Sequence, residues 1–308
     1  MLANFFGKSN PANFILLFLL FLGFFFAALF SDFSLVEIKS NDWGMYLTTI
    51  GLFILLFFFF NFILAKNKLT LYNSYGFLFF VLLFGIFPIT MFDRHELVVN
   101  LTILILLRRI YSLRTPKVVL KKMFDSGFWL SILFILNPFT LVYGVLLCAS
   151  IFIFQKLTIR TFLIPIVGFA APLLCYFTYC FWYDNIDSFL DLFAWYTNYD
   201  FQLYKEPKLL IPLIFIGVVS LFSILFKTPK AFLISGNYRK FWSLTILNLL
   251  VSVALVLFTV ERTGAELMCL FFPIAVILTN GVEGLSKRFF KDLILGIFLL
   301  IPIILLII

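Results

Sequence analysis

Charged residues are scarce in this sequence: Asp, Glu, Lys and Arg make up only 12% of its 308 residues. A soluble globular protein has about 25% charged residues, because it must cover its surface with polar groups. Here 63% of the residues are hydrophobic and the mean hydropathy is +1.12. These values exclude a soluble, disordered or fibrous protein. One membrane crossing needs about 20 apolar residues, so the chain has room for up to roughly a dozen crossings.

Metal-binding and disulfide motifs are also lacking. The chain has one histidine, no HExxH or HxxxH pattern, and four cysteines that lie in or beside apolar runs without the spacing of a zinc site. We therefore expect no metal and no cofactor, and we expect no nucleic-acid partner either. The 46 phenylalanines are interpreted as substitutes for leucine against lipid. No repeat, linker or soluble segment interrupts the pattern, so residues 1–308 are expected to form a single integral membrane domain.

The apolar runs predict an all-α transmembrane bundle of about eleven membrane segments. Nine runs are interpreted as single spans, at 14–30, 46–65, 75–92, 97–113, 161–181, 209–226, 241–260, 265–281 and 293–308. The run at 126–155 differs because Asn137-Pro138 interrupts it, which favours either one kinked helix or a hairpin of two short segments. Counted from Met123, the first arm has about 14 residues, or roughly 21 Å, too short to cross a core of about 30 Å.

The distribution of basic residues favours the hairpin at 123–155, with a cytoplasmic N-terminus. In that layout all of the 23 Lys and Arg residues lie inside except Lys39, Arg94, Lys205, Lys208 and Arg262. A single kinked span would move nine of them outside, namely Lys156, Arg160, Lys227, Lys230, Arg239, Lys240, Lys287, Arg288 and Lys291. Since short cytoplasmic loops carry an excess of Lys and Arg, the hairpin is preferred.

Acidic residues gather on the opposite side, which the rule for basic residues does not require. In the same layout all 15 Asp and Glu residues lie outside except Asp125, Glu283 and Asp292. The longest outer loop is predicted to contain an amphipathic helix over 183–200, lying on the outer membrane surface as structural cover or as a lid. Any polar chemistry is therefore expected at the outer, non-cytoplasmic face.

Three outer loops supply candidate site residues. Asp32 and Asp42 lie near the ends of the first two spans, where a carboxylate can act as a general base or simply be solvated. Arg94 and His95 belong to the turn Asp93-Arg94-His95-Glu96, which suits phosphate binding, proton transfer or a plain polar turn. Arg262 is a candidate phosphate ligand, and Glu266 either joins it or caps the next helix.

On the inner side, the basic run at 108–122 can bind anionic lipid headgroups or serve orientation alone. Ionisable residues deep inside the spans, which usually mark ion pathways, are lacking. This pattern disfavours a carrier or pump.

Three segments resemble a family of polytopic inner-membrane proteins of unknown function from Bacteroidota. They are LTILILLRRIYSL at 101–113, KMFDSGFWLSILFILNPFTLVYGVLL at 122–147, and ELMCLFFPIAVIL at 266–278, with the pattern Phe124-Asp125-x-Gly127. The resemblance covers the full length and implies an inner-membrane location but no activity.

A broader similarity is to the C-type glycosyltransferases, which use polyprenyl-phosphate-linked sugars. These enzymes have roughly eleven or more spans, an acidic residue in the first outer loop and a short helical hairpin after a glycine. Asp32 or Asp42 matches the acidic residue, while Gly127 with Asn137-Pro138 matches the hairpin. The chain lacks their paired Asp-Glu motif and their large outer domain, so the resemblance leaves catalysis open.

Two functions are therefore carried forward. The first is an inner-membrane protein of envelope biogenesis that handles a polyprenyl-phosphate-linked glycolipid at its periplasmic face, with Asp32 or Asp42 as general base if it is a glycosyltransferase. Arg94 and Arg262 would then hold the phosphate. The second is a non-catalytic subunit or scaffold of a multi-protein envelope or secretion complex. Membrane lipids are expected partners in both.

Overall fold

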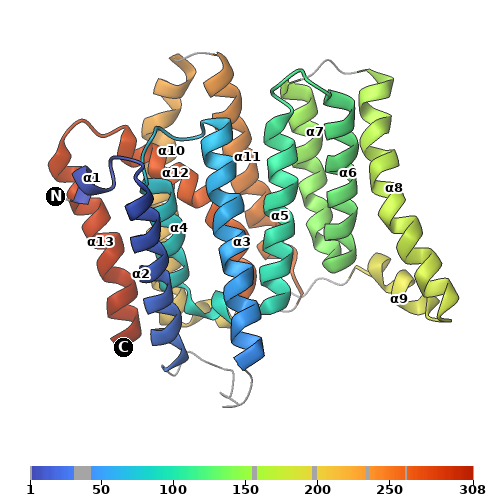
Figure 1. The fold of residues 1–308 in the computed structure, drawn as a ribbon, viewed down its shortest axis with the longest axis horizontal. Helices are drawn as coiled ribbons and strands as arrows, with labels where there is room; N and C mark the ends of the chain where they lie inside the picture. The colour runs from blue at the N-terminus through green and yellow to red at the C-terminus, as the bar shows by residue number, and fades with distance from the viewer. Residues whose placement is uncertain are drawn as a thin grey trace. The chain divides into compact units, whose positions relative to one another are not determined.

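The computed structural model describes residues 2–30, 43–154, 158–195, 200–233, 236–260 and 262–307, and all regular structure in these ranges is helical (Figure 1). Six helical segments are long and apolar enough to cross a membrane, at Pro11–Leu29, Tyr46–Asn67, Ile159–Trp182, Pro207–Leu233, Tyr238–Phe258 and Ala265–Glu283. The protein is therefore membrane-embedded. Helices also lie at each of the other predicted spans. How many of them cross, and from which side the chain starts, stay predictions.

The chain divides into two compact units. Unit 1 contains residues 1–97, 200–246 and 262–308, and unit 2 contains residues 98–199 and 247–261. Two helices, α5 (Arg94–Ser112) and α11 (Gly236–Phe258), begin in unit 1 and continue into unit 2. Both helices are therefore shared by the two units. The assignment of 1–308 to a single domain stays a prediction.

The centre of unit 1 is α4 (Tyr75–Ile86), all twelve residues of which are buried. The other helices that lie entirely in unit 1 are α1 (Leu2–Phe5), α2 (Pro11–Leu29), α3 (Trp43–Asn67), η1 (Pro88–Met91), η4 (Leu203–Lys205), α10 (Pro207–Leu233), η5 (Ala265–Leu270), α12 (Phe271–Glu283) and α13 (Arg288–Ile307). Helix α4 contacts α2, α3, α12 and α13, while α10 packs on α12. An apolar helix buried on all sides, such as α4, fits a membrane bundle core.

Phenylalanine rings fill this core. Phe60 of α3 stacks on Phe80 of α4 with ring centroids 3.9 Å apart and planes 7° from parallel. Phe84 meets Phe53 and Phe271 edge-on, at 5.2 and 4.9 Å. Edge-on and stacked pairs of this kind contribute beyond the area they bury. Many phenylalanines are therefore packing residues of unit 1, and their abundance is not explained by lipid contact alone.

The loops that the sequence assigns to opposite sides of the membrane lie at opposite ends of unit 1. At one end, the predicted inner segments are joined by hydrogen bonds: the Ala3 N–H donates to Asp292 at 2.7 Å, and Asn73 donates to Glu283 at 2.7 Å. At the other end, η1 contacts η5 and the Tyr204 hydroxyl donates to Glu266. The unit therefore has one polar end for each set of loops.

Unit 2 contains the predicted hairpin. Helix α6 (Val119–Leu136) ends at Asn137, whose side chain accepts a hydrogen bond from the Phe139 N–H at 3.1 Å, and η2 (Pro138–Val142) turns the chain into α7 (Tyr143–Phe154). Helices α6 and α7 contact each other and run in opposite directions (Figure 1). The chain thus folds back after Pro138, as expected of the hairpin and not of one kinked helix.

The first arm of the hairpin is longer than predicted. Helix α6 begins at Val119 and not near Met123, so its 18 residues extend roughly 27 Å. Lys121 and Lys122 belong to this helix, and the Lys122 ammonium donates to the carbonyls of Ser112 and Thr115 at 2.8 and 3.0 Å. The prediction counted the arm from Met123, whereas the structure includes both lysines, because a long side chain can place its charge beyond the end of an apolar helix.

The predicted outer amphipathic helix over 183–200 is much shorter in the structure. Helix α8 (Ile159–Trp182) is followed by Asp184 in the left-handed region at φ 51°, and only α9 (Ile186–Leu190) and η3 (Asp191–Phe193) are helical before Trp195. The expected apolar face is nevertheless used: Phe189 lies 5.1 Å from Phe177, and Phe193 lies 5.6 Å from Phe134. The left-handed residue gives the helix a later start, and its position on the outer membrane surface stays a prediction.

Candidate functional site

The candidate site lies at the end of unit 1 where η1, η4 and η5 meet. Gly264 precedes η5 and adopts φ +85°, a conformation that side chains other than glycine rarely take. A Cβ atom there would also lie 3.2 Å from Ile89 of η1. This tight turn directs Glu266 inward, where it is only 3% exposed.

The Glu266 carboxylate is held by donors from two segments. Its Oε1 accepts a hydrogen bond from the Tyr204 hydroxyl, and its Oε2 accepts one from the Thr263 N–H at 3.2 Å. Burial and the negative charge of Glu266 raise the pKa of Tyr204, while Arg262 opposes this effect. The Tyr204 hydroxyl therefore keeps its proton and remains a donor to Glu266.

Arg262 stacks on an aromatic ring beside this carboxylate. Its guanidinium lies 3.6 Å from the centroid of Phe201, within the range of a cation–π interaction. The ring contacts the flat face of the guanidinium. The N–H groups point outward in the guanidinium plane, which is the plane in which arginine binds carboxylate or phosphate. The ring thus fixes the position of a cation near Glu266.

Glu96 is the third charged member of the site. It lies in the first turn of α5, where its N–H donates to Asp93 Oδ1 at 3.1 Å. Burial, followed by the negative charges of Asp93 and Glu266, raises the pKa of Glu96 to about 7. A carboxyl group with this pKa is about half protonated at neutral pH and can act as an acid or as a base.

The structure brings together some of the predicted residues and not others. Arg262 and Glu266 belong to one cluster, as the sequence predicts for adjacent positions. Arg94 and His95 are exposed at the start of α5, next to Glu96. Asp32 and Asp42 lie outside the described residues, so their proposed role as a base stays a prediction.

Three members of the site were missed as functional residues. Glu96 was part of the polar turn, but the local sequence does not show that it faces Glu266. Phe201 and Tyr204 lie some sixty residues before Arg262 and Glu266 and were interpreted as parts of an interfacial loop. Only the packing of η4 beside η5 reveals their role.

We call Glu96, Tyr204, Arg262 and Glu266 the outer cluster. It places a carboxyl group of pKa about 7 near a second, hydrogen-bonded carboxylate and a ring-fixed cation. Such a set can bind an anionic group through Arg262 and exchange a proton through Glu96. Among the residues that the structure describes, no three His, Cys, Asp or Glu side chains are placed to hold a metal ion.

Comparison with known proteins gives the family but no activity. Neither the curated proteins nor the solved structures contain a significant match to this chain. A family model described as "Family of unknown function (DUF6427)" matches residues 8–308, which is nearly the whole sequence. This protein therefore belongs to the DUF6427 family of unknown function.

Proposed function

We propose that this protein acts in cell-envelope biogenesis in the inner membrane, where it handles a polyprenyl-phosphate-linked glycolipid at its periplasmic face. In this proposal the chain has eleven membrane segments and a cytoplasmic N-terminus, so that the outer cluster faces the periplasm. The excess of Lys and Arg in the predicted inner loops supports this orientation.

One observation supports the proposal best: the negative charge of Glu266, which comes from a different loop, helps to raise the pKa of Glu96 to about 7, and Arg262 of that loop stacks on Phe201. Two acidic groups near each other at a membrane surface are costly without a function or a compensating cation. Perturbed carboxyl groups of this kind are frequent at functional sites. A phosphate bound to Arg262 would place the linked sugar within the polar end of unit 1.

The residues then have separate roles. Arg262, with the exposed Arg94, binds the lipid phosphate. Glu96 or, in a C-type-like glycosyltransferase, Asp32 or Asp42 removes the proton from an acceptor hydroxyl. His95, exposed beside Glu96, is a second candidate for proton exchange.

The binding step can be tested with purified protein in nanodiscs and polyprenyl phosphate as the probe. Arg262→Gln is expected to weaken binding about tenfold, because a charge-assisted hydrogen bond is lost. Arg160→Gln, an exposed arginine at the start of α8, is the matched control and should remain within about twofold. Equal binding by wild type and Arg262→Gln, with both proteins monodisperse, would contradict the proposal.

The catalytic version needs a separate test in the cell that encodes the protein. Asp32→Asn and Asp42→Asn are expected to abolish an envelope glycan, measured by mass spectrometry of envelope extracts. Unchanged glycan in well-expressed variants would leave lipid binding without catalysis and reject the glycosyltransferase assignment.

The alternative function, a non-catalytic subunit of an envelope complex, is supported by α8. Only 11% of this apolar 24-residue helix is buried within the chain, so most of its surface is available to lipid or to a partner helix. Purification in mild detergent with crosslinking from Phe177 or Leu174 tests this. Recovery of a stoichiometric partner, together with unaltered phosphate-lipid binding by Arg262→Gln, would favour the subunit.

A further inference from the structure

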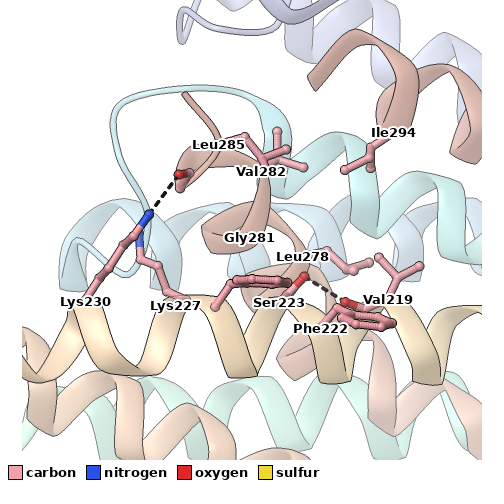
Figure 2. Close-up of a pocket in the computed structure, with 12 residues that line it drawn as sticks. Val219, Phe222, Ser223, Lys227, Lys230, Leu278, Gly281, Val282, Leu285 and Ile294 are labelled. Atoms are coloured by element: carbon pink, nitrogen blue, oxygen red, sulfur yellow. Dashed lines mark hydrogen bonds between the residues drawn. The ribbon is translucent and has the colours of Figure 1, made fainter. Parts of the chain in front are cut away.

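A pocket lies between α10 and α12, at the end of unit 1 opposite the outer cluster (Figure 2). It has a volume of about 240 Å³ and is lined by residues of α10, of α12 and the loop after it, and by Ile294 of α13. Its two halves differ chemically. Lys227 and Lys230 form one half, and Val219, Phe222 and Leu278 are among the apolar residues of the other.

Glycine residues give the pocket its shape. A Cβ atom on Gly281 would lie 2.4 Å from the Ser223 Oγ, so only glycine allows α12 to approach α10 this closely. Helix α12 ends at Glu283, and Leu285 in the loop that follows lies above the lysines in the view of Figure 2. The Lys230 ammonium donates to the Gly284 carbonyl at 3.4 Å, a long bond that holds the cation at the pocket.

The positive charge of the pocket is only partly offset by a carboxylate. Glu283 interacts electrostatically with Lys227, while its carboxylate accepts hydrogen bonds from the Leu71 N–H at 2.8 Å and from Asn73 at 2.7 Å. Neither Lys227 nor Lys230 forms an ion pair with any residue that the structure describes. Lys227 lies 5.7 Å from the ring of Tyr238, an aromatic contact that leaves its charge in place.

We propose that this pocket binds one anionic phospholipid of the cytoplasmic leaflet. The phosphate lies between Lys227 and Lys230, and one acyl chain follows the apolar half past the exposed Phe222 and Phe226 into the bilayer. Basic pockets between transmembrane helices on the cytoplasmic side are suited to such headgroups. The apolar half distinguishes a lipid from a free phosphate ion, which would leave it unfilled.

The proposal is independent of the outer cluster, because the two sites share no residue. It also gives the inner lysines a role beyond orientation. Lys227 and Lys230 lie at one end of a pocket, whereas Lys117 and Lys121 are exposed in the basic run at 108–122.

The test is native mass spectrometry of the full chain in detergent, with phosphatidylglycerol as the probe. Wild type is expected to retain one phosphatidylglycerol, and Lys227→Gln/Lys230→Gln to bind it at least about tenfold more weakly. The control Lys8→Gln/Lys66→Gln removes the same charge from exposed positions outside the pocket and the basic run, and it should stay within about twofold of wild type. Dihexanoyl phosphatidylglycerol, whose chains are too short to fill the apolar half, should bind more weakly than the long-chain lipid.

Three results would overturn the proposal. Equal retention of phosphatidylglycerol by wild type and by the Lys227/Lys230 double variant would exclude these lysines. Equal binding of zwitterionic phosphatidylcholine would exclude selection by charge. Competition by inorganic phosphate as strong as that by the long-chain lipid would show a phosphate site without a lipid. Lys227→Arg/Lys230→Arg, which keeps both charges, should retain the lipid and thereby separate lost charge from lost folding.

Discussion

Gly127 of α6 and Gly168 of α8 each lie against the backbone of the other helix. A Cβ atom on Gly127 would lie 2.0 Å from the Pro165 carbonyl oxygen, and one on Gly168 would lie 2.3 Å from the Phe124 carbonyl oxygen. Small residues that allow close backbone approach are the usual means of joining helices within a membrane. Gly127 is also the glycine of the Phe124-Asp125-x-Gly127 pattern, so this packing gives that pattern a physical basis.

Gly127→Ala and Gly168→Ala should therefore separate α6 from α8. Each added methyl group would overlap a backbone atom that no side-chain rotation can move away, so the expected loss of stability is about 1–3 kcal/mol. Thermal unfolding of the purified protein in detergent measures this loss.

Gly217→Ala is the matched control for these two variants. Gly217 lies inside α10, and a Cβ atom there would have nothing within 4 Å. Alanine is the better helix former, so this substitution should leave the melting temperature unchanged or raise it. Similar destabilisation in all three variants would show that the helix crossing is not tight.

Asn280 joins three segments at the end of unit 1 opposite the outer cluster. Its side-chain amide donates to the carbonyl of Leu69 at 3.0 Å and to that of Val276 at 2.9 Å, and its Oδ1 accepts from the Tyr238 hydroxyl at 2.5 Å. Asn280→Leu would leave the Tyr238 hydroxyl and the Leu69 carbonyl buried without a partner. We expect a loss of about 2–4 kcal/mol, and a smaller loss of about 1 kcal/mol for Tyr238→Phe.

A second buried asparagine provides the control for Asn280. Both polar atoms of the Asn248 side chain lack a hydrogen-bond partner in the part of the chain that the structure describes, and the residue is fully buried. Asn248→Leu should therefore be neutral or stabilising, since it removes an unsatisfied polar group. If both leucine variants unfold at the same lower temperature, the bonds of Asn280 do not contribute as described.

The stability of the protein should decrease as the pH rises from about 4.5 to 7, because Glu96 loses its proton in the folded protein. Its pKa is raised from 4.5 to about 7 in the folded protein, so the folded state binds more protons than the unfolded state in this interval. The protonated carboxyl group is therefore stabilising below pH 4.5, and this contribution is lost as the pH passes through 7. Because Glu96 is partly exposed, we expect the change to be about 1–2 kcal/mol.

Glu96→Gln should remove this pH dependence. Melting temperatures at pH 5 and pH 8 are to be compared in wild type, Glu96→Gln and the exposed control Glu206→Gln. The drop between pH 5 and pH 8 should shrink in Glu96→Gln and persist in Glu206→Gln. A drop of unchanged size in Glu96→Gln would assign the titration to another group.

The sequence predicts the helices of this fold well because apolar runs of membrane length are separated by polar loops. It also predicts the reversal at Asn137-Pro138, because proline removes a backbone donor and the basic residues require it. It does not predict which apolar helix is central. Helix α4 and the segment 265–283 are buried while α8 is exposed, yet all three are apolar, since lipid and protein interior select the same residues.

The candidate site was less predictable than the fold. The sequence places Glu96 and Glu266 in separate loops 170 residues apart, and nothing local shows that the two charges meet. Asp125, in contrast, belongs to the Phe124-Asp125-x-Gly127 pattern of the sequence. In the structure it forms an ion pair with Arg109 at 3.2 Å, within unit 2. A short pattern of residue types therefore identified a packing and ion-pair motif, while the polar site needed tertiary contacts.

The reversal of the chain between α6 and α7 makes a topological prediction that labelling can test. Because α6 and α7 run antiparallel, positions 115 and 158 flank the hairpin at the same side of the membrane, and position 188 follows α8 on the other side.

In a background without native cysteines, Thr115→Cys and Thr158→Cys should resist a membrane-impermeant maleimide in intact spheroplasts, whereas Ser188→Cys should react. Thr115 and Thr158 are exposed and Ser188 is partly exposed, so protection of Thr115→Cys and Thr158→Cys reports sidedness and not burial. Lysed spheroplasts give the control, since all three cysteines should then react. Labelling of Thr158→Cys from outside with Thr115→Cys protected would mean that the chain crosses once between them, and it would move Lys227 and Lys230 to the periplasm.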